Sequence, residues 1–333
     1  MKGNRSKARW LVLPAAAAVA VAMVGCGSSG KPATSAGHPL KVALITPSAT
    51  NDLAFSQAMY SAVESLKTKY NLQISVQDNM YVVADAANAI QQYAAEGYNL
   101  IIANGSQYGS TVQQLAPKYP KVSFAWGTAG STFGLKNVYA YQAAANEGGY
   151  VQGYMAALMS KSKVIGVIGP IDVGDAQLYT DGFKAGVLAA DKSATVHLSF
   201  TGSFSDVSLM ASAAHSYVSE GADVLTGSSQ SVVGAIGVAK SDSVAWFGTQ
   251  WDQSSLAPSD VVSSQVYNWV PVLDQIITGI KAGKLGGATY IITLRNGGEK
   301  IVFNASYPLP ASIKASGMSV LSKIESGVLT APQ

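Results

Sequence analysis

Two hydrophobic rhythms alternate along the chain. Short, continuously apolar runs, such as KVALITP at 41–47 and YNLIIANG at 98–105, have the length and composition of buried strands. Longer segments between them carry apolar residues at helical spacing, for example Phe55, Met59 and Val63. Strands and helices in this alternation predict right-handed βαβ units and parallel sheets.

The second half of the chain repeats the first. KVIGVIGP at 163–170 matches KVALITP, and VAWFGT at 244–249 matches VSFAWGT at 122–128. In each copy the two matched runs begin 81 positions apart. The sequence therefore predicts an α/β protein built from two copies of one Rossmann-like lobe, in which each Trp-containing phrase is the last parallel strand.

The repeat and the later segments suggest a domain organisation. We assign 40–140 and about 258–285 to the first lobe, with a strand and a helix in the later segment. The second lobe takes 141–257 and about 286–306, which includes a predicted hairpin at 288–303 around Asn296-Gly297-Gly298. Residues 307–333 form a C-terminal helix and tail. Several crossings between the lobes predict a hinge and a clamshell that closes over a cleft.

The N-terminus has the features of an export signal. Residues 1–25 combine a basic start with an apolar stretch too short to span a bilayer comfortably. Cys26, the single cysteine, follows in MVGCGSSG and resembles a bacterial lipobox. We predict lipidation at Cys26, a flexible tether over 26–39, and a protein held on the extracytoplasmic face of the cell membrane. An ordinary secretory signal with a coincidental cysteine is the alternative.

Charge and residue types exclude several functions. The formal net charge is +3, but four basic residues lie in the first 25 positions, and the remainder has 18 basic against 19 acidic residues. This near-neutral body offers no electrostatic footprint for nucleic acid. The histidines His38, His197 and His215 have no metal-ligand spacing. We expect no metal, no cofactor and no enzymatic activity. The acids near predicted strand ends, which an enzyme would need, are Asp52, Asp172, Asp175 and Asp252.

Aromatic and amide side chains gather where predicted strands end. Ligands of open α/β sheets bind beyond the carboxyl ends of the strands, so GTAG at 127–130 and GTQW at 248–251 should face one cleft. Asn51 and Asp52 either cap the next helix or bind the ligand. Phe55 either contacts the ligand or belongs to the hydrophobic core, and the sequence favours neither. The other candidates are Ser106, Gln107, Tyr108, Phe204, Ser228, Gln230, Gln250, Trp251 and Asp252. These groups suit a flat, neutral, hydrogen-bonding ligand better than a phosphate or an amino acid.

Several motifs together resemble a known family. EGGYVQGYMAALMSKS at 147–162 and GTQWDQSSLAP at 248–258 are the most specific, beside the lipobox and the Asn-Asp-x-x-Phe loop. From about 40 to 320 their order is similar to the basic membrane protein family of ABC-transporter substrate-binding lipoproteins. The resemblance implies a periplasmic-binding-protein type I clamshell that passes purine nucleosides to permease subunits. Some relatives bind free nucleobases or a flavin. We expect a monomer.

The resemblance also implies roles for individual residues. Phe55 and Phe204 would sandwich the base, with Asn51 or Asp52 beside its nitrogens.

Three positions depart from the family pattern. Thr128 and Gln250 stand where the family has Asp, and Tyr267 is the nearest equivalent of a Lys. In nucleoside binders these charged residues grip the ribose hydroxyls, so we hypothesise a ligand with a different or absent sugar, such as a free nucleobase.

Two other binding functions remain open. The same clamshell could present its ligand to a membrane receptor as a sensor. It could also bind a sugar, with Trp126, Trp246 and Trp251 available to stack on a pyranose ring.

Overall fold

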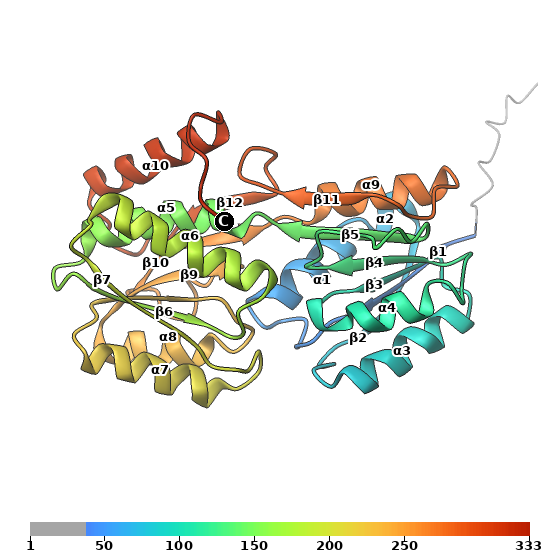
Figure 1. The fold of residues 1–333 in the computed structure, drawn as a ribbon, viewed down its shortest axis with the longest axis horizontal. Helices are drawn as coiled ribbons and strands as arrows, with labels where there is room; N and C mark the ends of the chain where they lie inside the picture. Colours follow the sequence, from blue (N-terminus) through green and yellow to red (C-terminus); the bar gives the residue numbers. More distant parts are fainter. Residues whose placement is uncertain (1–37) are drawn as a thin grey trace, which may run out of the picture. The chain divides into compact units, whose positions relative to one another are not determined.

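The computed structural model describes residues 38–333 as two α/β lobes (Figure 1). The predicted signal peptide 1–25, Cys26 and the tether up to residue 37 lie outside the described residues. Within the described part, no helix is long and apolar enough to cross a membrane.

The first lobe is a six-stranded, fully parallel sheet in the order β11-β5-β4-β3-β1-β2. Its strands are β1 (Leu40–Ile45), β2 (Leu72–Gln77), β3 (Leu100–Ala103), β4 (Ser123–Gly127), β5 (Val138–Ala143) and β11 (Thr289–Ile292). Its helices are α1 (Phe55–Ser65), α2 (Lys67–Tyr70), α3 (Val83–Ala95), the 3-10 turn η1 (Ser106–Tyr108), α4 (Gly109–Leu115) and α9 (Val270–Lys281). The central strand β3 is buried throughout, as expected for a parallel strand covered by helices on both faces.

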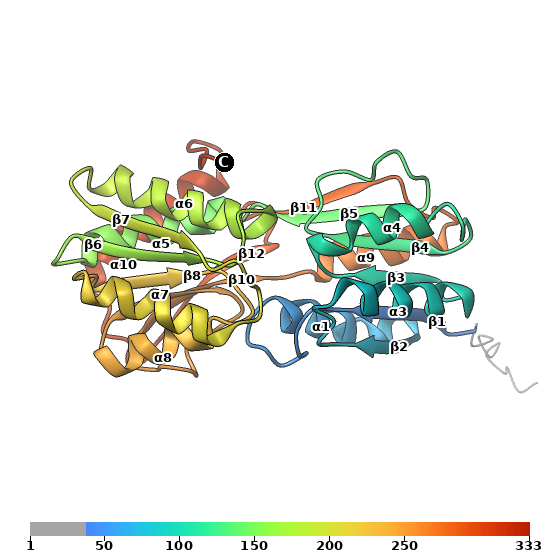
Figure 2. The ribbon, with the colours of Figure 1, turned by 60° about the horizontal axis from the view of Figure 1, so that its bottom comes forward.

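The second lobe repeats this plan in the order β12-β10-β9-β8-β6-β7, with only β12 antiparallel (Figure 2). Its strands are β6 (Val164–Gly169), β7 (Thr195–Phe200), β8 (Val224–Gly227), β9 (Ala245–Gln250), β10 (Val261–Tyr267) and β12 (Glu299–Phe303). Its helices are α5 (Ala145–Met159), α6 (Gly174–Ala190), α7 (Val207–Ser219), α8 (Val233–Asp242) and α10 (Ala311–Glu325). The predicted α/β fold with two similar lobes is confirmed.

The last third of the chain crosses between the lobes differently from the prediction. β10 joins the second sheet beside β9, whereas α9 packs against α1 of the first lobe. The hairpin predicted over 288–303 is wrong, because β11 pairs with β5 in one sheet and β12 pairs with β10 in the other. β10 is buried along almost its whole length, so it needs a neighbour on each side. β5 lies beyond β4 in the first sheet, and β10 lies beyond β9 in the second. β4 and β9 are therefore interior strands and not the last of their sheets.

Glycines let α5 and α6 approach until their backbones touch. A Cβ atom on Gly153 would lie 1.9 Å from the carbonyl oxygen of Phe183, and one on Gly186 would lie 2.1 Å from that of Tyr150. Side chains at these positions would force the helices apart. The glycine-rich start of the 147–162 motif thus serves helix packing, and this contact sets where the first turn of α6 lies.

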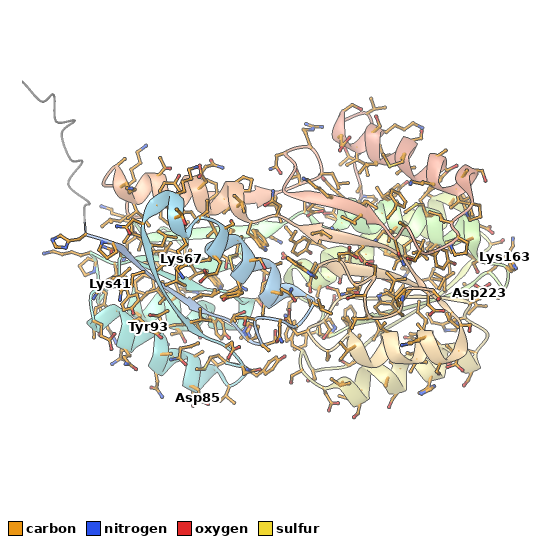
Figure 3. The ribbon with its side chains drawn as sticks, turned by 180° about the vertical axis from the view of Figure 1, so that it is seen from behind. Lys41, Lys67, Asp85, Tyr93, Lys163 and Asp223 are labelled. Atoms are coloured by element: carbon orange, nitrogen blue, oxygen red, sulfur yellow. The ribbon has the colours of Figure 1, made fainter. Side chains whose placement is uncertain are left out.

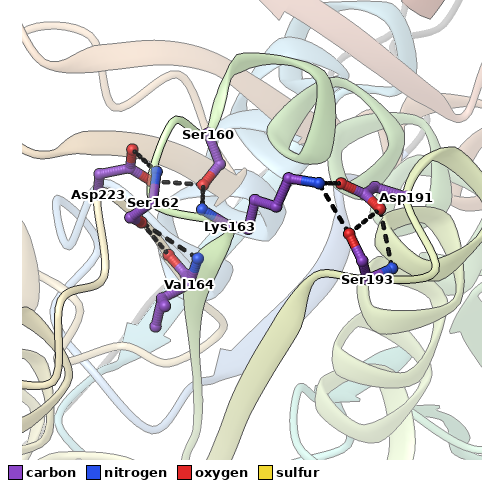
Figure 4. A network of polar contacts seen from close by, with 7 residues as sticks. All are labelled: Ser160, Ser162, Lys163, Val164, Asp191, Ser193 and Asp223. Atoms are coloured by element: carbon purple, nitrogen blue, oxygen red, sulfur yellow. Dashed lines mark hydrogen bonds and ion pairs between the residues drawn. The ribbon is translucent and has the colours of Figure 1, made fainter.

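A polar network joins the amino ends of strands in the second lobe (Figure 3, Figure 4). This is the end of the sheet opposite the carboxyl ends. The Asp223 carboxylate accepts hydrogen bonds from the backbone N–H groups of Lys161 at 2.7 Å and Ser162 at 3.0 Å. Lys163 has a left-handed φ of 61° and pairs with Asp191 at 2.9 Å. The network fixes the entries of β6 and β8, and leaves their carboxyl ends to carry the site.

The α5–α6 contact makes a testable prediction. Gly153→Ala should lower the free energy of unfolding by about 2–3 kcal/mol, because its methyl group overlaps the Phe183 carbonyl. Gly237→Ala in α8 is the matched control, since a Cβ there has no atom within 4 Å and alanine is the better helix former. Urea unfolding measures both, and equal stability of the two variants would contradict this packing.

Candidate ligand-binding site

A pocket lies where the carboxyl ends of strands from both lobes meet. Its empty volume, including the part that opens to solvent, is about 410 Å³. The first lobe lines it with Pro47, Phe55, Gly105, Ser106, Gln107 and Thr128. The second lobe lines it with Val173, Asp175, Ala176, Phe204, Ser228, Ser229, Gln230 and Gln250.

The structure brings together about half of the residues predicted for the site. Those that line the pocket are Phe55, Ser106, Gln107, Thr128, Phe204, Ser228, Gln230 and Gln250. Those that lie elsewhere are Asn51, Asp52, Tyr108, Trp126, Trp251, Asp252 and Tyr267.

Asp52 is the helix cap, which was one of its two expected roles. Its carboxylate accepts hydrogen bonds from the N–H groups of Ala54 at 2.8 Å, Ser56 at 3.1 Å and Gln57 at 3.0 Å, and from the Ser48 hydroxyl. Four bonds fill the lone pairs of a carboxylate. They satisfy the free N–H groups at the start of α1, so little of this carboxylate remains for a ligand.

Tyr108 and Trp126 support the pocket from behind. The Tyr108 hydroxyl donates to the carbonyl oxygen of Met80 at 2.7 Å, and the side chain is fully buried. The Trp126 indole N–H donates to the carbonyl oxygen of Gly105 at 3.2 Å. Both aromatic residues therefore hold the loop that carries Ser106 and Gln107.

Trp251, Asp252 and Tyr267 lie away from this pocket. Asp252 accepts a hydrogen bond from the Ser254 N–H at 3.0 Å and so shapes its own loop. Trp251 and Tyr267 line a separate cavity between α1 and the start of α9, with an empty volume of about 330 Å³ that also includes open solvent. Tyr267 is 3% exposed there, and its ring packs edge-on against that of Trp269, which also lines the second cavity.

Two pocket amides have an unused oxygen. The Gln250 side chain is 4% exposed and donates from Nε2 to Ser228 Oγ at 3.3 Å, while its Oε1 is buried without a protein partner. Gln230 Oε1 is also buried without a partner. A buried acceptor without a donor costs about 1–3 kcal/mol, so these two oxygens favour a ligand that brings N–H or O–H groups.

Asp175 lines the pocket but was not among the residues predicted for the site. It lies in the first turn of α6, is 3% exposed, and accepts the Ala143 N–H at Oδ1 over 3.3 Å. Its Oδ2 has no partner. No motif marks it, and its only signal is a position soon after a predicted strand.

Burial decides the charge of Asp175. The helix N-terminus favours a negative charge by only about 0.3–1 kcal/mol, whereas burying an unpaired carboxylate costs several kcal/mol. Burial accordingly raises the pKa of Asp175 to about 8, against a small lowering by the Ala143 N–H.

Phe204 is held by Ser229, which also lines the pocket. Ser229 Oγ donates to the carbonyl oxygen of Phe204 at 3.0 Å and ties its loop to the end of β8.

The pocket has no Lys, Arg or His among its lining residues. Across residues 38–333, no three His, Cys, Asp or Glu side chains gather as metal ligands would.

Two facing α/β lobes with a polar, aromatic-lined pocket define the class of two-lobed solute-binding proteins. The family model of ABC transporter substrate-binding proteins, PnrA-like, matches residues 40–324. The chain belongs to this family, as its motifs had indicated.

Proteins similar to this chain bear different names. A purine-binding protein of Brucella abortus is 30% identical over 72% of this chain and 68% of its own. The transcriptional activator protein med of Bacillus subtilis is 26% identical over 84% of this chain and 86% of its own. A solute-binding protein of an ABC transporter system from Aeropyrum pernix has the same fold, with a TM-score of 0.76 at 18% identity over 89% and 94% of the two chains.

The raised pKa of Asp175 predicts a pH dependence of stability. Its folded pKa of about 8 exceeds the unfolded value of about 3.9. The stability contributed by the protonated form is complete below the unfolded pKa and is lost as the pH rises toward 8. Asp175→Asn does not titrate at this position. Its melting temperature, compared with that of the native chain, should therefore rise progressively as the pH increases from 5 to 8.

Asp191→Asn provides a control, because the pKa of Asp191 is shifted in the opposite direction. Hydrogen bonds from Ser193 and the ammonium group of Lys163 lower the pKa of the half-buried Asp191 to about 2. Its effect should be constant between pH 5 and 8 and should fade only in strong acid. If the difference in melting temperature between Asp175→Asn and the native chain stayed constant over the same range, the raised pKa of Asp175 would be contradicted.

Proposed function

We propose that this protein captures a neutral heteroaromatic solute, a purine nucleobase above all, and delivers it to the permease of an ABC importer. Family membership supports a solute-binding function, which is not an enzymatic one. The observation that carries the ligand class is a pocket with two phenylalanines, two unsatisfied amide oxygens and no basic side chain.

The pocket's aromatic residues suit a flat ring. Phe55 is 3% exposed at the start of α1, and the half-buried Phe204 approaches from the second lobe. Stacking between aromatic faces contributes about 0.5–1.5 kcal/mol beyond the area buried. Because the two rings come from different lobes, a ring bound between them would join the lobes and favour closure.

Neutral side chains occupy positions that would otherwise grip a ribose. Thr128 and Gln250, which stand in place of family acids, both line the pocket. A buried acid left without sugar hydroxyls would penalise a free base, and neutral groups reduce that penalty. We therefore favour a nucleobase over a nucleoside. The name of the Brucella relative supports a purine.

The proposed cellular setting follows from the family. Substrate-binding proteins of ABC transporters work outside the cytoplasm, and a lipid on Cys26 would hold this monomeric protein beside its permease. Such an anchor keeps the captured solute close to the transporter.

A regulatory function is the second candidate, because one relative bears the name of a transcriptional activator. The same pocket would then sense its ligand and pass the signal to a membrane partner. Crosslinking this protein to its neighbours tests the choice between the two. Recovery of permease subunits would support import, and recovery of a receptor in their place would support sensing.

A thermal-shift panel tests the ligand class. Adenine, guanine and hypoxanthine should raise the melting temperature more than their nucleosides, riboflavin or sugars do. A ligand at 100 times its Kd adds about 2.7 kcal/mol of stability. Gln250→Ala should weaken the best ligand about tenfold through loss of its amide oxygen. Tight nucleoside binding that Gln250→Ala leaves intact would refute the nucleobase proposal.

Phe204 should carry part of the affinity. Phe204→Ala removes one face of the proposed sandwich and should weaken purine binding about tenfold. Phe133→Ala is the matched control, because Phe133 is 52% exposed, stacks on Trp126 and does not line the pocket. Isothermal titration compares the two, and equal losses would argue against a stacking role.

A further inference from the structure

The pocket contains one carboxyl group and no cation to balance it. The side chains that interact electrostatically with Asp175 are Tyr141 on β5, Tyr267 on β10 and Glu299 on β12, and none of them is positive. Glu299 is itself 1% exposed, so a negative charge there or on Asp175 would disfavour the other. A buried carboxyl group without a cation keeps its proton.

The hydrogen bond from Ala143 indicates which oxygen of Asp175 carries that proton. Oδ1 accepts the N–H of Ala143, and the carbonyl oxygen of a carboxylic acid is a better acceptor than its hydroxyl oxygen. The proton therefore belongs on Oδ2, which is buried and has no partner among the described residues. A protonated Oδ2 is an O–H donor in a residue that lines the pocket.

We infer that Asp175 is a specificity-determining residue, which donates a hydrogen bond from Oδ2 to an acceptor atom of the ligand. The acceptor is a ring nitrogen or a carbonyl oxygen, and this choice of ligand class rests on the proposed function. A neutral acid that donates in this way is a known use of a buried carboxyl group.

The donor at Asp175 complements the acceptors on the other side chains. Gln230 Oε1 and Gln250 Oε1 need donors, whereas Asp175 needs an acceptor. A ligand edge on which an exocyclic amine adjoins an unprotonated ring nitrogen supplies both kinds of group. A ligand with a C–H in place of that nitrogen leaves the buried O–H unpaired, which is costly.

Deaza analogues of adenine test the contact directly. Each of 1-, 3- and 7-deazaadenine replaces one ring acceptor with C–H, and titration calorimetry at pH 6.5 compares them with adenine. One analogue should bind the native protein about tenfold more weakly. In Asp175→Ala, which lacks the donor, that difference should disappear. Equal discrimination by Asp175→Ala and the native protein would overturn the inference.

The pH dependence of adenine binding distinguishes a donor from a carboxylate acceptor. A donor predicts constant affinity from pH 5.5 to 7.5 and a loss above about pH 8, as the proton leaves. Asp175→Asn keeps an N–H donor at this position, so it should bind within about threefold of the native protein at pH 6.5 and lose the pH dependence. Affinity that falls in acid, with a large loss in Asp175→Asn, would mean that Asp175 accepts hydrogen bonds as a carboxylate.

Glu299→Gln is the matched control. It also removes a buried carboxyl group, but Glu299 does not line the pocket and accepts from Gln265 Nε2 at 2.6 Å. This variant should keep the loss of affinity above about pH 8.

Infrared spectra of the ligand-free protein separate this inference from the proposed function. At pH 6.5, subtracting the spectrum of Asp175→Asn from that of the native protein should leave the carbonyl band of a protonated carboxylic acid. Its absence would overturn the inference, whatever ligand binds. Failure of every adenine probe would count against the purine proposal, while the band would still decide whether Asp175 is a neutral donor.

Discussion

The backbone contact between α5 and α6 is the constraint on which the site depends. Gly153 and Gly186 let the two helices approach to a distance that a single methyl group would prevent. This contact places the start of α6 at the end of β5, so that Asp175 of the second lobe meets the Ala143 N–H of the first. The most specific family motif in the chain therefore acts indirectly, through the position of a helix end.

Desolvation then determines the chemistry of the pocket. Its polar side chains are amides, hydroxyls and one carboxyl group, and none of its lining residues brings a positive charge. In this environment a carboxyl group is neutral, and unpaired amide oxygens are costly. The pocket is thus complementary to a neutral molecule with both donors and acceptors, and unsuited to an anion.

Sequence patterns predicted the regular part of the structure well. The apolar runs became the parallel strands, because strands covered on both faces must be apolar throughout. The repeat predicted two lobes, and strand ends located Phe55, Thr128 and Gln250 in one pocket. Prediction failed for β11, which the Asn296-Gly297-Gly298 turn suggested was half of a hairpin. Local turn residues do not reveal which distant strand offers a free edge.

The sequence by itself determined the two-lobed α/β plan, the family and the aromatic, amide-rich character of the strand ends, because these follow from local residue patterns. Only the tertiary structure decided which polar groups serve the fold and which face a ligand. Asp52 and Asp175 are both acids soon after a strand, yet the first is saturated by backbone N–H groups and the second keeps one oxygen free. The physical reason is that hydrogen-bond saturation and desolvation depend on the neighbours that folding brings together.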